Sequence, residues 1–179
     1  MGLAAAVAVS GVTVQAAESE QTIVPLVAAE PSSTARRAAG SCVARADWGF
    51  RRDDLAYQVA RIVNRYRSRN GLRRLRLEGG LMRSAIWKAQ HMAHFFYFGH
   101  ADPAPPIRRG VHQRLAACGF QGGGSENIAY GFDSAQEVVR AWLRSPGHRR
   151  NIRAAYWHYL GVGVAQSRNG GFFWAQNFG

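Results

Sequence analysis

Glu126 and His148 are the residues whose type and position point most directly to chemistry. Glu126 follows three consecutive glycines and precedes a short apolar run. An acid between permissive backbone and a strand-like segment usually has a specific role. His148 follows Ser145-Pro146, which predicts the start of a helix. In the first helical turn the partial positive charge of the terminus favours a neutral imidazole, the form that binds metal ions.

Other catalytic patterns are weaker. His91 and His94 are three residues apart on a predicted helix, but no glutamate beside them completes a His-Glu-x-x-His motif. We expect both to pack at the surface or in a groove. Ser125 lies outside any Gly-x-Ser-x-Gly elbow, and Ser145 has the position of a helix cap. Glycines 122–124 lack the Lys-Ser/Thr of a phosphate loop.

The composition fits one domain with a tail and a strongly basic surface. The 179 residues carry a formal charge of +12, and Lys88 is the single lysine, so arginine supplies nearly all of the positive charge. Such a surface attracts phosphates, acidic polysaccharides and anionic lipids. Solubility is the alternative explanation for the charge. No dedicated nucleic-acid motif is present, and we expect a monomer.

The N-terminal part has the character of an exported protein. Residues 1–17 are apolar and uncharged and end near a small-x-small cleavage pattern, which predicts a signal peptide. The basic segment that normally precedes the apolar run is missing, which fits a truncated signal or a wrongly assigned start. Residues 18–50 are expected to form a flexible linker, and residues 51–179 the domain. Cys42 and Cys118 form either one disulfide or two free thiols.

Helical periodicity comes first in the chain and strand-like segments come last. The hairpin signal Asn169-Gly170 joins the final two strands. This order predicts an α+β fold with an antiparallel sheet. The expected helices cover about residues 53–70, 81–96, 107–117, 135–143 and from 146 onward, and the expected strands cover 160–165 and 172–175. Asp53 or Asp54 is expected to cap the first helix, and Ser134 a later one.

Six short motifs occur in the order found in one known family. They are Asn64-Arg65-Tyr66-Arg67, Ala89-Gln90-His91-Met92-Ala93 leading to Gly99-His100, Ser125-Glu126-Asn127-Ile128-Ala129, Val138-Val139-Arg140-Ala141-Trp142 with Ser145-Pro146-Gly147-His148, Gly161-Val162-Gly163 and Trp174-Ala175-Gln176-Asn177-Phe178-Gly179. Over about residues 55–179 the chain thus resembles the CAP superfamily of cysteine-rich secretory, antigen 5 and pathogenesis-related proteins. The resemblance is strongest to the short bacterial SCP-like branch.

This resemblance implies a three-layer α-β-α sandwich with a mainly antiparallel central sheet and a polar cleft. His100 and His148 match the two histidines that hold a divalent metal, often zinc, in the family, and Glu126 matches one of its two acids. The second acid of the family falls on Ser145. Asn127, beside Glu126, is expected to line the cleft with these four residues.

The resemblance leaves several functions open. The first is an exported protein of the cell envelope or extracellular space, whose cleft binds a divalent metal and then a small ligand, peptide or envelope component. The second is a metal-dependent, peptidase-like hydrolase with Glu126 as general base. The third is a polyanion or anionic-lipid module. In a further interpretation, His100, His148 and Glu126 form a polar cluster satisfied internally.

Overall fold

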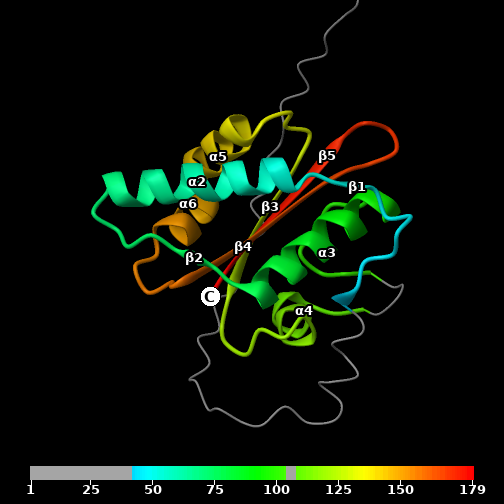
Figure 1. The fold of residues 1–179 in the computed structure, drawn as a ribbon, viewed down its shortest axis with the longest axis horizontal. Helices are drawn as coiled ribbons and strands as arrows, with labels where there is room; N and C mark the ends of the chain where they lie inside the picture. Colours follow the sequence, from blue (N-terminus) through cyan, green and yellow to red (C-terminus); the bar gives the residue numbers. More distant parts are fainter. Residues whose placement is uncertain (1–41, 104–107) are drawn as a thin grey trace, which may run out of the picture.

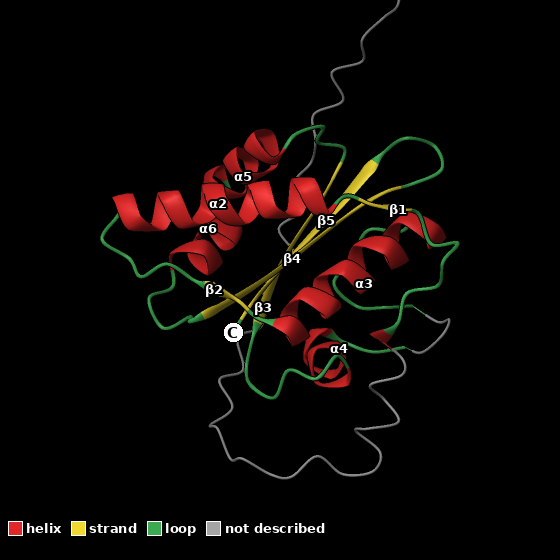
Figure 2. Cartoon of the chain, viewed as in Figure 1, coloured by secondary structure: helices red, strands yellow, loops and turns green. Residues whose placement is uncertain are grey.

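The computed structural model describes residues 42–103 and 108–179, in which five helices surround a five-stranded sheet. The helices are α2 (Asp53–Arg69), α3 (Gly79–Phe95), α4 (Val111–Ala117), α5 (Ala135–Arg144) and α6 (Pro146–Arg153). The strands are β1 (Phe50–Arg51), β2 (Arg76–Leu77), β3 (Ser125–Tyr130), β4 (Tyr159–Gln166) and β5 (Phe172–Phe178). Figure 1 shows their order along the chain, and Figure 2 shows helices on either side of the sheet.

The sheet is mainly antiparallel, as predicted. Its order is β1-β4-β5-β3, and the short β2 pairs in parallel with β4. The predicted hairpin joins β4 to β5, and Gly170 in its turn has a φ of +87°, a value that glycine adopts without strain. Register places Glu126 of β3 opposite Asn177 of β5. This register fixes the acid near the C-terminal end of the central hairpin.

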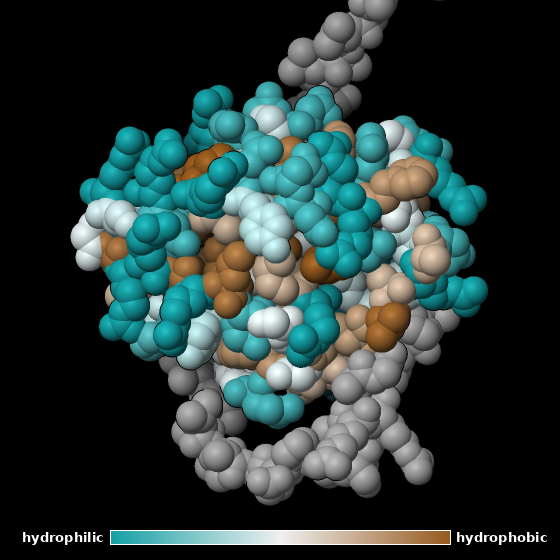
Figure 3. All heavy atoms as spheres, in the orientation of Figure 1, coloured by the Kyte–Doolittle hydropathy of each residue, from teal (hydrophilic) through white to brown (hydrophobic). Residues whose placement is uncertain are grey.

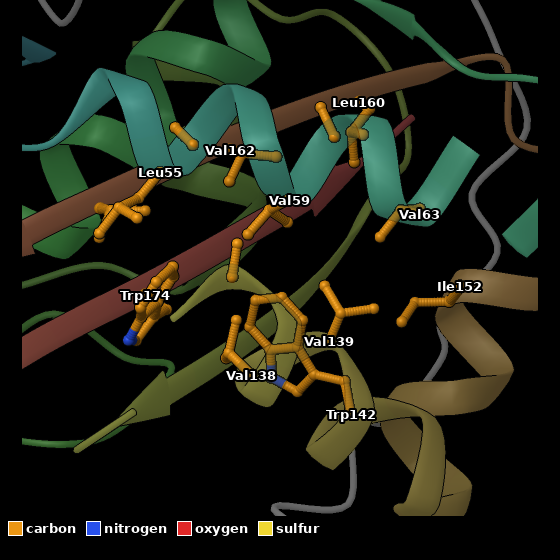
Figure 4. Close-up of a cluster of buried hydrophobic side chains, with 14 of the residues drawn as sticks. Leu55, Val59, Val63, Val138, Val139, Trp142, Ile152, Leu160, Val162 and Trp174 are labelled. Carbon is orange, nitrogen blue, oxygen red and sulfur yellow. The ribbon is translucent and has the colours of Figure 1, made fainter. Parts of the chain in front are cut away.

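Helices cover both faces of the sheet, so the predicted α-β-α sandwich is confirmed. Helices α2, α5 and α6 lie over one face and α3 over the other (Figures 1 and 2). Because side chains alternate along a strand, each face has its own apolar cluster. Figure 4 shows the larger cluster, where side chains of α2, α5, α6, β4 and β5 meet: Leu55, Val59, Val63, Val138, Val139, Trp142, Ile152, Leu160, Val162 and Trp174.

The opposite face packs unusually close to α3. A Cβ atom added at Gly161 would lie 2.1 Å from the backbone of Leu81, and one at Gly163 would lie 2.2 Å from the backbone of Ala85. The two glycines therefore let β4 lie directly against the helix backbone. Figure 3 shows apolar residues near the middle of one face of the molecule, between α2 and α3, with hydrophilic residues around them.

The helix ends differ in part from the prediction. Ser134 caps α5 by accepting a hydrogen bond from the backbone N–H of Glu137 at 3.2 Å, as expected. The predicted cap of α2 is wrong, because Arg52 occupies the N-cap position. Asp53 and Asp54 lie in the first turn and pair instead with the two arginines that precede them. Helix α4 begins at Val111, later than predicted.

Residues 42–50 pack with the domain, although the sequence analysis placed them in the linker. Cys42 and Cys118 form a disulfide, and Trp48 is only 3% exposed against Trp87 and His94. The predicted signal peptide and the rest of the linker lie outside the described residues. In the described ranges, no helix combines the length and hydrophobicity needed to cross a membrane.

Candidate functional site

Glu126 and His100 are in direct contact, and His148 lies close by. Glu126 is the second residue of β3 and is 4% exposed, and its Oε1 lies 2.9 Å from Nδ1 of His100 in the loop after α3. His148 lies in the first turn of α6, as predicted, and is 9% exposed. It is near enough to His100 for a charge on one ring to alter the pKa of the other. Three distant segments thus meet at one site.

Asn127 holds α6 against the sheet. Its side-chain amide donates to the backbone carbonyl oxygen of His148 at 3.2 Å and to Oε1 of Gln176 at 3.1 Å. Its Oδ1 accepts a hydrogen bond of 2.9 Å from Asn151 of the same helix. The structure buries Asn127 completely, so this residue positions His148 and does not line a cleft as the sequence analysis expected.

Ser145 joins α5 to α6 and is half-buried. It occupies the N-cap position of α6, as predicted, but its side chain makes no capping hydrogen bond. Pro146 at the first helical position lacks an N–H group, so it presents one donor fewer to cap. His148 therefore depends for its place on Asn127 and on the proline-started turn, with no help from the Ser145 hydroxyl.

Glu126 is held as a buried anion. Its Oε2 forms an ion pair with Arg114, and with the Asn177 amide oriented to satisfy Ser84 and Ala85, Asn177 also donates to this oxygen at 3.1 Å. Burial alone raises the pKa of Glu126, but Arg114, His100 and Lys88 outweigh it and lower the pKa to about 2. Both carboxylate oxygens are engaged.

A buried ionic network, which the sequence analysis did not include, extends from Glu126 to Asp102. Arg114 forms ion pairs with both acids, and its Nη1 lies 2.6 Å from Oδ1 of Asp102. Asp102 also accepts from Lys88 at 2.9 Å and from Arg109 at 2.9 Å. The sequence could have indicated that Lys88 is buried, because it lies at helical spacing within the apolar stripe of α3. No sequence pattern indicated that Arg114 is buried.

Lys88 fixes the loop that carries His100. Its ammonium group donates to the backbone carbonyl of His100 at 3.1 Å and to the Tyr97 hydroxyl at 3.0 Å. Burial and the nearby Arg114 lower the pKa of Lys88 to about 8, although Glu126 and Asp102 oppose this shift. The backbone and the ring of His100 are thus both anchored to buried charges.

His148 is a buried neutral imidazole. Burial, and secondarily the charge of His100, lower its pKa to about 4. Its Nδ1 is inaccessible to solvent and has no hydrogen-bond partner among the described residues. An unpaired buried ring nitrogen is costly in a purely structural role.

The free energy of unfolding should decrease as the pH is lowered from about 6.5 to about 4, because of His148. Its depressed pKa means that the unfolded chain takes up a proton in this window and the folded chain does not. The resulting loss is up to about 1.4 kcal/mol per pH unit. Denaturant unfolding at several pH values checks this: His148→Gln should reduce the slope, and the exposed control His158→Gln should retain it. Equal slopes in all three proteins would contradict the assignment.

The imidazoles of His100 and His148 are the side chains at this site that could contribute to a divalent metal site. Within residues 42–103 and 108–179, no group of three His, Cys, Asp or Glu side chains could hold a metal ion. Glu126 is engaged by Arg114 and His100 and is not a free ligand. Because an ionised carboxylate only accepts, Nδ1 of His100 donates to Glu126, and Nε2 is the ring nitrogen that this contact leaves unused. This carboxylate–histidine pairing is common beside bound metals.

Residues 60–178 match the family model described as CAP, cysteine-rich secretory protein family. Among curated proteins, the chain is 34% identical over 121 residues to the uncharacterized protein YkwD of Bacillus subtilis, covering 68% of this chain and 45% of YkwD. It is 29% identical over 123 residues to the uncharacterized membrane protein YlbC of B. subtilis, covering 68% of this chain and 33% of YlbC. The chain thus spans less than half the length of these relatives.

Two solved structures have a similar fold. An extracellular protein with an SCP domain from Bacillus anthracis is 28% identical, with a TM-score of 0.60 over 70% of this chain and 40% of its own. An outer surface protein from Borrelia burgdorferi is 19% identical, with a TM-score of 0.65 over 73% of this chain and 97% of its own. At this identity, the second likeness concerns the fold alone.

Proposed function

Because the chain belongs to the CAP, or cysteine-rich secretory protein, family, we propose that it is an exported protein with a metal-dependent binding site. In this proposal, His100 and His148 bind a divalent metal ion, with zinc as the first candidate. The same site would also take a small ligand or a partner at the cell envelope or outside the cell. The Cys42–Cys118 disulfide supports export, since disulfides persist in oxidising compartments.

One observation carries the metal proposal. The His148 ring is neutral at pH 7, and its buried Nδ1 has no hydrogen-bond partner among residues 42–103 and 108–179, beside a histidine whose own Nδ1 is fixed by Glu126. Two imidazoles supply fewer protein ligands than the three or four usual for zinc. We therefore expect an affinity below that of structural zinc sites. When bound, the ion supplies positive charge and open coordination positions for a ligand.

Glu126 has a positioning role in this proposal. A carboxylate with a pKa near 2 is a weak base, and contacts with Arg114, His100 and Asn177 engage both of its oxygens. These features support binding over the alternative in which Glu126 is the general base of a hydrolase. Its negative charge holds the His100 ring and raises the basicity of the nitrogen available to the metal.

Calorimetric titration of zinc into the full-length, metal-stripped protein tests the proposal. We expect saturable binding of about one ion per chain, which the double variant His100→Ala/His148→Ala abolishes. The matched control His112→Ala/His158→Ala removes two exposed histidines and should bind as the wild type does. Glu126→Gln should weaken binding about 10- to 100-fold by releasing the His100 ring.

Equal binding by the wild type and the His100/His148 double variant would overturn the proposed metal site. Circular dichroism of each variant shows whether the fold is retained. Turnover of peptide or envelope-polymer substrates by the zinc-loaded protein, lost in a folded Glu126→Gln variant, would favour the hydrolase.

A further inference from the structure

A pocket lined in part by Phe96 lies near Tyr130, at the end of β3 opposite Glu126. It has a volume of about 210 Å³ and is formed by the end of α3, the loop around Asp47 and the β4–β5 turn. Tyr130, at this end of β3, is four residues from Glu126, or about 13 Å along the strand at about 3.3 Å per residue. The pocket is therefore separate from the proposed metal site.

Phe96, on the wall of this pocket, is held in a strained conformation. It ends α3 with φ 50° and ψ 54°, in the left-handed region that glycine or asparagine normally occupies at this position. The residue is 57% exposed, and its ring makes edge contacts with Tyr130 and Phe173 at centroid distances of 6.0 and 5.9 Å. Neither the backbone geometry nor the exposed ring is explained by core packing, and such strain gathers at ligand sites.

Ser167 adds an unsatisfied polar group to the same pocket. The residue is 4% exposed, and its hydroxyl is buried without a hydrogen-bond partner in the described part of the chain. Its backbone N–H is already used by the carbonyl of Gly171 at 2.8 Å. A buried hydroxyl that neither donates nor accepts costs stability, and a ligand hydroxyl would pair with it.

The remaining polar side chains of the pocket favour an uncharged ligand with several hydroxyl groups. Asp47 and Arg168 contribute opposite charges, and Asn169 contributes both a donor and an acceptor. Because these two charges are opposite, the pocket does not favour a phosphate or carboxylate, and its polar walls disfavour an alkyl chain. A sugar ring presents a C–H face that packs on an aromatic ring and an edge of hydroxyls that hydrogen-bond. At about 210 Å³ the volume suits one such ring rather than a drug-sized molecule.

We propose that this pocket binds one neutral sugar ring of a saccharide, with Phe96 stacking against the ring and Ser167, Asn169 and Asp47 reading its hydroxyls. The site is independent of the metal, so it adds a carbohydrate contact to whatever His100 and His148 bind. In an exported protein, such a contact attaches the domain to a glycan of the surrounding envelope or matrix.

Backbone amide NMR of the full-length protein tests the proposal by titration with maltotriose, cellotriose and the trisaccharide of N-acetylglucosamine. At least one of them should give saturable shifts confined to amides near residues 93–97 and 167–170. Ser167→Ala and Phe96→Gly should each weaken this binding at least about fivefold, as expected for a lost hydrogen bond or stacking contact. Glycine adopts a positive φ freely, so Phe96→Gly removes the ring without straining the backbone.

Two further variants separate this site from the rest of the molecule. Phe98→Ala removes a neighbouring exposed aromatic ring that is not part of the pocket and should bind as the wild type does. The His100→Ala/His148→Ala variant should keep saccharide binding even if it loses zinc. The proposal is overturned if none of the trisaccharides gives saturable shifts, if inorganic phosphate does so instead, or if Phe98→Ala weakens binding as much as Ser167→Ala.

Discussion

Replacement of Arg114 by methionine should lower the free energy of unfolding by about 3–5 kcal/mol, because it removes one partner from a buried ionic network. Arg114 is fully buried and joins Glu126 to Asp102. Asp102 would keep Lys88 and Arg109, but Oε2 of Glu126 would lose its cationic partner while it stays buried. Methionine fills much of the volume, so the loss reflects charge and not a cavity.

Chemical denaturation of the full-length protein at neutral pH measures this effect. The control Arg150→Met removes an exposed arginine of α6 and should change stability by less than about 0.5 kcal/mol. The double variant Arg114→Met/Glu126→Gln should lose about 2 kcal/mol less unfolding free energy than the two single losses added together. The reason is that the double variant has no unpaired Glu126 charge. If the single changes simply add, burial of an unpaired Glu126 charge is not the cause.

Replacement of Cys42 and Cys118 by serine should lower the free energy of unfolding by about 4 kcal/mol. The disulfide closes a loop with a sequence separation of 76 residues. Constraining a loop of this length lowers the entropy of the unfolded chain by about this amount in the chain-entropy model. For a domain of this size, the melting temperature should fall by roughly 10 °C. The loss should also release the segment that carries Trp48 from α3.

Thermal and denaturant unfolding of the double serine variant, with and without reductant, check this prediction. Reductant should lower the stability of the wild type to nearly that of the variant, and it should not change the stability of the variant. A variant that unfolds at the same denaturant concentration as the oxidised wild type would show that contacts of Trp48 alone hold the N-terminal segment.

Local sequence patterns predicted most of the secondary structure. The apolar stripes of α2, α3 and α5, the Ser145-Pro146 start of α6 and the Asn169-Gly170 turn all rest on interactions between residues near in sequence. The motif order predicted the family, and with it the layered fold. The start of the packed domain was missed, because residues 42–50 are ordered by the disulfide and by Trp48, which are long-range contacts.

From the sequence alone, the arginine-rich composition was interpreted as a property of the protein surface. Three of the arginines do not lie at the surface of the folded protein. Arg67, Arg109 and Arg114 are buried. Arg67 donates to the backbone carbonyls of Ile152 and Ala154, and so joins α2 to the end of α6. A sequence does not distinguish these arginines from exposed ones, because their partners lie far away in the chain. Part of the basic character is therefore internal scaffolding.

By itself the sequence determined the α+β class and the family, and it predicted His100, Glu126 and His148 as site residues, since each follows from local pattern or motif. Only the tertiary structure decided the surroundings of these three side chains. It buried Glu126 beside Arg114 and left Nδ1 of His148 without a hydrogen-bond partner in the part of the chain that the structure describes. Charge states and free lone pairs depend on the dielectric and on neighbours from other elements, and these exist only once the chain has folded.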